Sequence, residues 1–230
     1  MQLILPGNPE IPVVMRRSTR ARRMSLRVAG IDGRVTLSLP AHVDEAVALA
    51  FLESRAAWLR SHVAAVPGEI AVGPGVELPV LGTARRVVAG SGRRVVLGPS
   101  EVAVPGPEAQ VASRLRGFLR ETARVQLAAA VEVHSAALGV RASGLALRDV
   151  RSRWGSCTAH GRLMFSWRLV LAPAEVLDYV AAHEVAHLRE MNHGPRFWAL
   201  VAELCPGYAS SRRWLRVEGA GLHRYRFEAA

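Results

Sequence analysis

The feature that most constrains the fold of this chain is the pentapeptide His183-Glu184-Val185-Ala186-His187. It stands in a segment whose apolar residues recur at helical spacing from Pro173 to about Arg189, and proline favours the first turn of a helix. Residues four apart lie one above the other on a helix, so the two imidazoles can converge on one cation. The chain is therefore expected to contain a helix that presents two metal ligands on one face.

A third histidine, His193, follows six residues after His187. Six residues is too far for the same face of a continuing helix, so His193 reaches the cation only if the chain turns back. The local residues permit this turn: Asn192 tolerates a left-handed conformation, Gly194 is unrestricted, and Pro195 can start the next helix. We expect His193 to be the third ligand, with a simple turn residue as the alternative.

These residue types match the chemistry of zinc. Zinc accepts nitrogen ligands, lowers the pKa of its water to about 7, and keeps a fourth position open in catalytic sites. Glu184 stands between the two helical histidines and can take a proton from such a water. The pattern predicts a Zn²⁺ site at His183, His187 and His193, with Glu184 as the catalytic general base.

Other side chains near the motif have two interpretations. Cys157 can ligate zinc as a thiolate, which would close the site, but a lone cysteine is more often a small buried residue. Tyr179, four residues before His183, can donate to an oxyanion or pack as a core aromatic. Glu190 is expected to be a solvated charge. Four further residues are expected to be structural or to lie at the surface: His134, His160, Cys205 and His223.

The N-terminal part of the chain predicts short strands and one helix. Residues 24–28 and 35–39 alternate in polarity around a central glycine-containing turn, which indicates a hairpin. Residues 43–66 have helical spacing and acidic residues in the first turn, which indicates one helix. Three short apolar runs separated by glycines are expected to be small strands: 76–81, 85–88 and 93–97.

Pro105-Gly106-Pro107 is the sharpest break in the pattern, and a long helical pattern runs from there to Leu138-Gly139. The pattern beyond it predicts two strands and two short helices: 145–151, 163–171, 195–204 and 210–217. We therefore expect an α+β chain of two domains. A β-rich N-terminal portion, residues 1–105, precedes a mainly helical C-terminal domain with a small sheet, residues 106–230.

Basic charge in this chain comes from arginine alone. Thirty arginines against 19 acidic residues give a formal net charge of +11, and there is no lysine. Six of the arginines lie between Arg16 and Arg27 with no acid among them, which permits a weak contact with nucleic acid phosphates. A solvated edge strand is the favoured interpretation, because no aromatic residue interleaves the run to stack on bases.

Composition also bounds the environment of the chain. Half of the residues are hydrophobic and 21% are charged, which excludes wholesale disorder. No apolar stretch approaches the roughly 18 residues of a membrane helix, and the first 15 residues lack the features of a signal peptide. Two cysteines provide no disulfide framework. The expectation is a soluble cytoplasmic protein without membrane contact; oligomeric state is not predicted.

Two motifs beside the histidine helix carry a resemblance to a known family. The segment Arg151-Ser152-Arg153-Trp154-Gly155-Ser156-Cys157 and the segment Asn192-His193-Gly194-Pro195-Arg196-Phe197-Trp198, together with the helix between them, resemble the YgjP-like metallopeptidases. These are cytoplasmic zincin-like proteins related to the SprT-like group. The specific part of the resemblance runs from about Arg148 to Trp214. Ser166 departs from the family pattern, in which asparagine is expected.

The resemblance implies a zincin-like C-terminal domain with zinc held by the three histidines and Glu184 in the catalytic role. The expected function is hydrolysis of peptide bonds in a peptide or protein substrate by a metal-activated water. In zincin architecture a strand beside the metal helix offers its edge to an extended peptide, and the segment Leu163–Val170 is expected to be that edge. Two alternatives are a nucleic-acid-associated adaptor and a structural zinc domain without proteolysis.

Overall fold

The computed structural model describes residues 2–66 and 68–228, and the chain divides into two compact units, residues 1–68 and 69–230. The expected break at residue 105 lies inside the second unit. The reason is packing: apolar residues of the 69–105 segment, such as Val87 and Val104, share one buried core with the long helix that follows. The sharp Pro-Gly-Pro turn therefore separates two elements of one unit.

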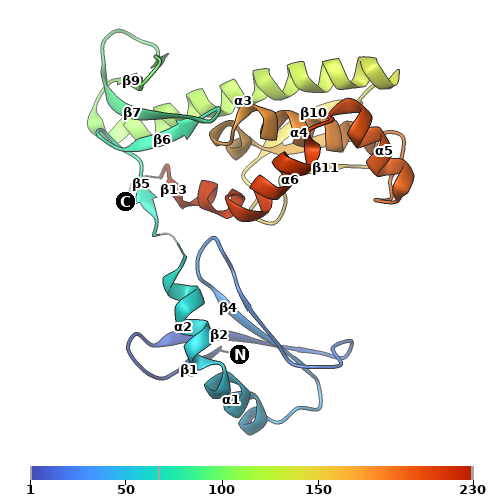
Figure 1. Cartoon of the computed structure of the whole chain (residues 1–230). Helices are drawn as coiled ribbons and strands as arrows, with labels where there is room; N and C mark the ends of the chain where they lie inside the picture. Colours follow the sequence, from blue (N-terminus) through green and yellow to red (C-terminus); the bar gives the residue numbers. More distant parts are fainter. Residues whose placement is uncertain (1, 67, 229–230) are drawn as a thin grey trace. The chain divides into compact units, whose positions relative to one another are not determined.

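The first unit is a four-stranded sheet with two helices (Figure 1). Its strands are β1 (Gln2–Leu5), β2 (Ile11–Ser18), β3 (Ser25–Val28) and β4 (Val35–Pro40). The order is β1-β2-β4-β3, with β2 and β4 parallel and the other two pairs antiparallel. The predicted hairpin is confirmed by the pairing of β3 with β4.

Residues 43–66 form two helices where the sequence predicts one. Helix α1 (Glu45–Ser54) ends at Arg55, whose φ of −109° and ψ of 7° leave the helical region, and α2 (Ala56–Ala64) follows at once. Leu52 of α1 and Leu59 of α2 are both buried in the core of this unit. Alternate residues of β2 and β4 complete that core, because a strand directs successive side chains to opposite faces.

The six arginines between Arg16 and Arg27 are all exposed in the first unit. Arg17 donates hydrogen bonds to the carbonyl oxygens of Ala41 and Val43 at 3.0 and 2.5 Å. Arg16 and Arg27 alternate with the inward-facing residues of β2 and β3 and lie on the other face of the sheet. The run is thus charged and solvated, as favoured from the sequence, but it is not an edge strand throughout: β2 is paired on both sides, and only Arg27 lies on the edge strand β3.

The second unit begins with a small sheet against a long helix. The strands are β6 (Glu77–Val80), β7 (Thr83–Gly90), β8 (Val96–Leu97) and β9 (Glu101–Pro105), in the order β6-β7-β9-β8. The sequence did not predict β9, which pairs in parallel with β7. Helix α3 (Glu108–Leu138) runs along one side of the unit (Figure 1) and ends at Gly139, whose φ of 62° is left-handed.

A three-stranded sheet lies beside the helices that carry the histidines. Its strands are β10 (Gly144–Arg148), β11 (Gly155–Cys157) and β12 (Arg162–Ser166). The order is β10-β12-β11, so β12 is the central strand. The expectation that Leu163–Val170 forms a free edge is therefore wrong: both sides of β12 are paired, and Trp167–Leu171 form a 3-10 helix, η1.

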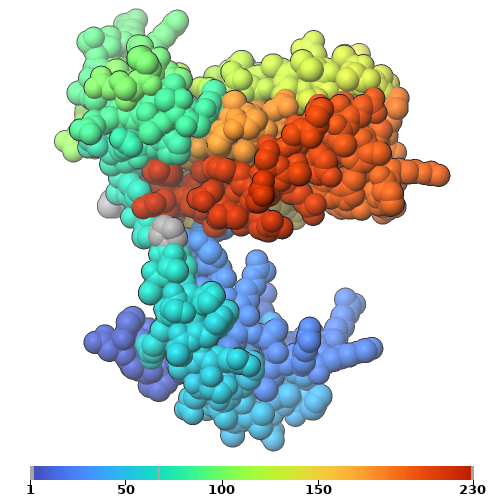
Figure 2. Space-filling view, viewed as in Figure 1, coloured from blue at the N-terminus to red at the C-terminus, as the bar shows by residue number. Residues whose placement is uncertain are grey.

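The C-terminal part is helical. Helices α4 (Ala174–Ala186), α5 (Pro195–Leu204) and α6 (Tyr208–Val217) are followed by the 3-10 helix η2 (Gly219–Arg224). Strand β13 (Tyr225–Arg226) then pairs in parallel with β5 (Ile70–Ala71). Helix α4 packs against α3, α5, α6 and β11. In the space-filling view these C-terminal elements, orange to red, form one continuous face of the second unit (Figure 2).

The fold class expected from the sequence is confirmed: a mixed α+β chain with N-terminal strands and a helical C-terminal part that holds a small sheet. The core of the second unit is built from side chains of α3, α4, α5, β12 and η1, including the fully buried Phe165, Trp167 and Phe197. Among the helices of the described residues, none combines the length and apolar character that a membrane span requires.

Candidate metal centre

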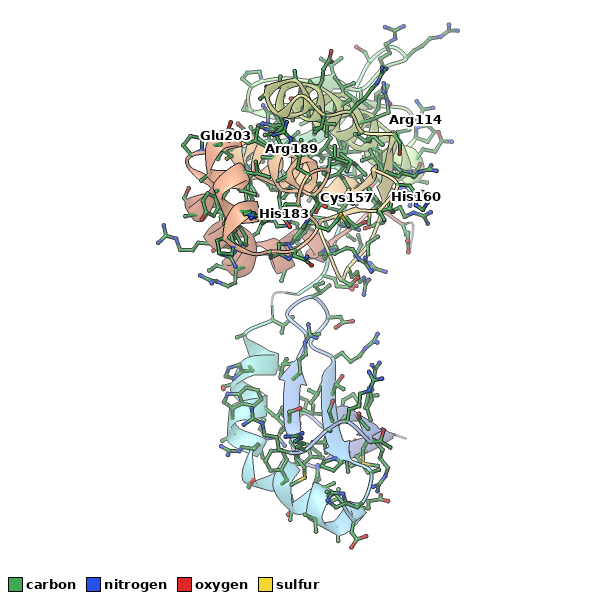
Figure 3. All side chains as sticks on the ribbon, turned by 90° about the vertical axis from the view of Figure 1, so that its right-hand side faces the viewer. Arg114, Cys157, His160, His183, Arg189 and Glu203 are labelled. Carbon is green, nitrogen blue, oxygen red and sulfur yellow. The ribbon has the colours of Figure 1, made fainter. Side chains whose placement is uncertain are left out.

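Three histidines converge at the end of α4. His183 lies in the last turn of α4, His187 follows its final residue, and His193 comes from the loop before α5. The Nε2 atom of His193 lies 3.1 Å from Nε2 of His187 and 3.1 Å from Nε2 of His183. Figure 3 shows His183 on α4, whose neighbour β11 carries Cys157. The structure therefore brings together the three histidines that the spacing singles out.

The chain reverses direction immediately after His187. The amide of Glu190 donates to the carbonyl of Ala186 at 3.0 Å, which closes the last turn, and the amide of Gly194 donates to the carbonyl of Asn192 at 2.7 Å. Pro195 then begins α5 at the first helical position. This turn is what returns His193 to the face of α4, as the residue types indicate.

The tautomer of His187 is set by a backbone carbonyl. Its Nδ1 lies 3.0 Å from the carbonyl oxygen of Glu190, which can only accept, so Nδ1 carries the proton and the Nε2 lone pair faces the other histidines. A tetrahedral ion with metal–nitrogen distances of about 2.0–2.1 Å places its nitrogen ligands roughly 3.3 Å apart. The separations of 3.1 Å fit this spacing within a few tenths of an ångström.

The surroundings keep the imidazoles of His183 and His187 neutral. Burial, with a smaller contribution from the nearby His187, His193 and Arg212, lowers the pKa of His183 to about 3. Burial also lowers the pKa of His187. A neutral imidazole retains the lone pair that binds a metal, whereas a protonated one does not. The Nδ1 atom of His183 is buried and has no hydrogen-bond partner among the described residues.

Two aromatic side chains of α5, Phe197 and Trp198, pack against the imidazole rings of the three histidines. The buried ring of Phe197 lies between 4.4 and 4.8 Å from the centroids of all three imidazoles. Trp198 stacks on His193 at 6.0 Å and meets the edge of His183 at 5.9 Å. Reasoning from histidine spacing alone missed Phe197 and Trp198, although their places in the first turn of α5, directly after the third histidine, could have indicated them.

Glu184 is buried beside the histidines, with 5% of its surface exposed. Its Oε2 atom has no hydrogen-bond partner among the described residues. Burial raises the pKa of the Glu184 carboxyl to about 8, and the positive charge of Arg153 partly opposes that rise. A Cβ atom on Gly155 of β11 would lie 2.4 Å from Oε1 of Glu184, so only glycine leaves room for the carboxylate in this position.

The model of the YgjP-like metallopeptidase domain matches residues 22–218, which is most of the chain. This chain belongs to the YgjP-like metallopeptidase family. The matched range begins in the loop before β3 of the first unit and ends just after α6, so it contains the three histidines, Glu184 and Gly155.

Two further comparisons describe the similarity of this YgjP-like chain to known proteins. One solved structure, the metallopeptidase zymogen abylysin of Pyrococcus abyssi, aligns with a TM-score of 0.36 and 19% sequence identity. The alignment covers 40% of this chain and 95% of that chain. No curated protein matches the chain.

The sequence leaves two interpretations each for Cys157 and Tyr179, a functional role or simple packing, and the structure of the YgjP-like domain shows where both side chains lie. Cys157 is half-buried, its thiol donates to the carbonyl of Thr158 at 3.4 Å, and it is not part of the cluster of ligand atoms found among the described residues. Tyr179 is buried, and its ring meets His183 and stacks on Tyr208. Burial raises the pKa of Tyr179 to about 12, with Arg212 opposing. Both positions match the packing interpretation.

Other polar residues of the YgjP-like domain serve its structure. The buried His134 of α3 pairs with Asp178 of α4, with 2.9 Å between Nε2 and Oδ1. The buried His223 lies against Trp154, with ring centroids 5.1 Å apart. Glu190 acts through its backbone carbonyl on His187. Cys205 is half-buried and His160 is exposed.

Proposed function

We propose that this protein is a zinc-dependent peptidase in which His183, His187 and His193 hold the metal and Glu184 is the general base. The observation that carries the proposal is the convergence of three imidazole Nε2 atoms beside the buried carboxylate of Glu184, whose Oε2 atom has no hydrogen-bond partner among the described residues. Membership of a metallopeptidase family supports a peptide or protein substrate.

The donor set favours zinc among the biological metals. Three imidazole nitrogens with no thiolate in the cluster are typical of a catalytic zinc site that keeps an open fourth position. Magnesium and calcium prefer oxygen ligands. When zinc is bound, it polarises the scissile carbonyl and lowers the pKa of its water to about 7.

Glu184 moves the proton in the proposed reaction. Its carboxylate accepts a proton from the attacking water and then delivers that proton to the leaving amine. Burial gives the carboxylate a higher proton affinity than an exposed glutamate has, which suits both roles. A cation at the three imidazoles opposes this effect of burial and keeps the resting carboxylate ionised.

We propose that the substrate binds at β11 in place of the edge expected from the sequence. Strand β11 has one strand neighbour, β12, and it contacts α4. An extended peptide can add to such an edge through main-chain hydrogen bonds. Because Gly155 of β11 stands against Glu184, a peptide on this edge would pass beside the general base.

The decisive experiment is metal content measured together with proteolysis for the wild type and Glu184→Gln. We expect about one zinc per chain in both proteins and cleavage of a casein or peptide substrate by the wild type alone. Glutamine keeps the shape of the side chain but cannot accept the proton, so turnover should fall by at least about a thousandfold. Equal cleavage by both zinc-loaded proteins would refute the mechanism.

A nucleic-acid-associated adaptor is the second candidate, favoured by the six exposed arginines of the first unit. Phosphate contacts depend steeply on salt, so a DNA duplex should bind at low salt and weaken at moderate salt. A variant with glutamine at all six positions from Arg16 to Arg27 should lose that binding. If the variant binds DNA as the wild type does, this candidate is excluded.

A structural zinc domain is the third candidate, and Cys157 is the residue that would close its site. The thiol stands outside the ligand cluster of the described residues. A Cys157→Ala variant should therefore retain its zinc under the peptidase proposal and lose it under the structural one. Both cysteines are free, which suits the reducing cytoplasm in which we propose that the protein acts.

A further inference from the structure

Arg212 of α6 is held beside the histidine cluster by an aromatic ring. Its guanidinium carbon lies 4.4 Å from the ring centroid of Trp198, a distance that defines a cation–π contact. The same Trp198 ring stacks on His193 and meets the edge of His183. The ring of Trp198 therefore contacts both this guanidinium and two imidazoles of the candidate metal centre.

The Trp198 ring that supports Arg212 is itself fixed. Tyr208 stacks on Trp198 with centroids 5.5 Å apart, and Phe197 meets it edge-on at 5.1 Å. A guanidinium that rests on a fixed ring loses less conformational freedom on binding a ligand than a freely moving one. Arg212 is exposed, so its N–H groups remain accessible to a ligand.

A second arginine approaches the site from another element. Arg153 lies two residues before Gly155, in the segment that leads into β11. Its charge is close enough to lower the pKa of the Glu184 carboxyl, against the effect of burial. Both β11 and α6 contact α4, so the two arginines reach the site from different neighbours of the histidine helix.

Neither arginine is neutralised within the part of the chain that the structure describes. The ion pairs found there involve other residues, and no hydrogen bond found there joins Arg153 or Arg212 to a carboxylate. The next residue along α6, Arg213, is also exposed. The two arginines nearest the candidate metal centre therefore have no carboxylate partner among the described residues, so both can bind a carboxylate from outside the chain.

We propose that this peptidase selects substrates with acidic side chains close to the scissile bond, and that Arg212 and Arg153 recognise those carboxylates. The inference rests on the proposed peptidase function and specifies its substrate class. Carboxylates match the planar, forked geometry of a guanidinium. An extended peptide advances by about 3.3 Å per residue, so side chains within about three residues of the scissile bond come within reach of both arginines.

The first test compares two fluorogenic peptides that differ only by glutamate or glutamine on each side of a fixed cleavage site. The wild type should cleave the glutamate peptide at least about tenfold more efficiently in kcat/KM, with the preference shrinking as salt is raised. Arg212→Gln and Arg153→Gln should each reduce the ratio several-fold. Arg212→Lys should restore part of it, and the control Arg213→Gln, whose side chain points about 100° around the helix, should leave it unchanged.

A second measurement is independent of turnover. The zinc-loaded Glu184→Gln protein should bind the fluorescently labelled glutamate peptide more tightly than the glutamine peptide, and adding Arg212→Gln should abolish that difference. Equal binding of the two peptides would overturn the inference, as would an acidic preference that survives in both arginine variants.

A wild type that cleaves both peptides equally would overturn the inference and leave the peptidase proposal standing. Failure of the zinc-loaded wild type to cleave any peptide would overturn the peptidase proposal, and the binding measurement would still decide whether the site selects carboxylates.

Discussion

The carboxylate of Glu184 fills the space that a side chain at Gly155 would need. A Cβ atom on Gly155 would lie 2.4 Å from Oε1 of Glu184 and 2.8 Å from its carboxyl carbon. No side chain fits at residue 155 while the carboxylate keeps its place. Because the atoms that would be displaced belong to the end of a side chain, a larger residue at 155 would move the carboxylate while leaving the fold intact. The strand therefore defines where the proposed general base stands.

Substitution of Gly155 by alanine should separate metal binding from catalysis. We expect Gly155→Ala to fold and to bind zinc, because the three atoms nearest to the new methyl group all belong to Glu184, while kcat falls at least about tenfold because Glu184 is displaced. Zinc analysis and peptide cleavage check this. Gly144→Ala in β10, where a Cβ would meet no atom within 4 Å, is the matched control and should keep wild-type kcat. Wild-type kcat in Gly155→Ala would contradict the assigned position of Glu184.

Removal of one histidine should remove the metal. His193→Ala leaves two nitrogen ligands on α4, so zinc content should fall well below one per chain and chelator should no longer lower Tm. A ligand present at a hundredfold its Kd stabilises the folded state by about 2.7 kcal/mol, so zinc should raise the Tm of the wild type measurably. His160→Ala, an exposed residue of the turn before β12, should retain the metal and the shift. A stoichiometric zinc content in His193→Ala would show that the metal lies elsewhere.

The second unit should depend strongly on a buried arginine. The Arg168 side chain is 9% exposed and donates to both oxygens of Asp149 at 2.7 and 3.1 Å. It also donates to the carbonyls of Leu222 and Tyr225. Burial favours the neutral acid, yet the hydrogen bonds and charge of Arg168 outweigh it and lower the pKa of Asp149.

Arg168→Ala leaves these acceptors without their donor, and we expect the free energy of unfolding to fall by about 3 kcal/mol. Urea unfolding followed by tryptophan fluorescence measures the change, because four of the five tryptophans lie in the second unit. Arg124→Ala, which breaks an exposed pair with Glu121 on α3, should change stability little. Equal stability of the two variants would refute a structural role for Arg168.

Stability should decline in mild acid because of His223. Burial lowers the pKa of His223 to about 4, and the positive charges of Arg168 and Arg151 add to the effect against the opposing Asp149. In the unfolded chain the same imidazole takes up a proton below about pH 6.5, so the unfolded state binds more protons between pH 6.5 and 4. The free energy of unfolding therefore decreases as the pH falls from about 6.5 to about 4.

Between pH 7 and 5 the contribution of His223 amounts to about 2 kcal/mol. His223→Gln cannot take up the proton, so its stability should change less over the same pH range. Urea unfolding of both zinc-free proteins at pH 7 and 5 gives the comparison. An identical pH dependence in the variant would show that His223 does not contribute.

The sequence predicts the histidine helix and its turn because both are local. The spacing of His183 and His187 places them on one face, and the Asn192 to Pro195 residues supply the reversal. The hairpin of β3 and β4 and the end of α3 at Gly139 follow from the same kind of local signal. Each depends on residues within a few positions of one another, so the pattern contains the information.

Strand order and domain limits depend on distant partners and were missed. β12 lies between β10 and β11 because β10 crosses over to pair with it in parallel, which leaves β11 as the edge beside α4. β9 joins β7 in the same way, and apolar residues of the 69–105 segment pack on α3, so the compact units divide at Gly68. The alternation of residues within a strand indicates which face is buried, but it does not indicate which distant strand becomes its neighbour.

The sequence by itself determined which histidines meet, because helical spacing and a short turn bring them together whatever else the chain does. The tertiary structure alone decided what surrounds them. The packing of β11 on α4 places Gly155 against Glu184, and the packing of α6 on α4 accompanies the contact between Arg212 and the ring of Trp198. Such contacts join residues that are remote along the chain, and they form only when the burial of a shared core aligns the elements that carry them.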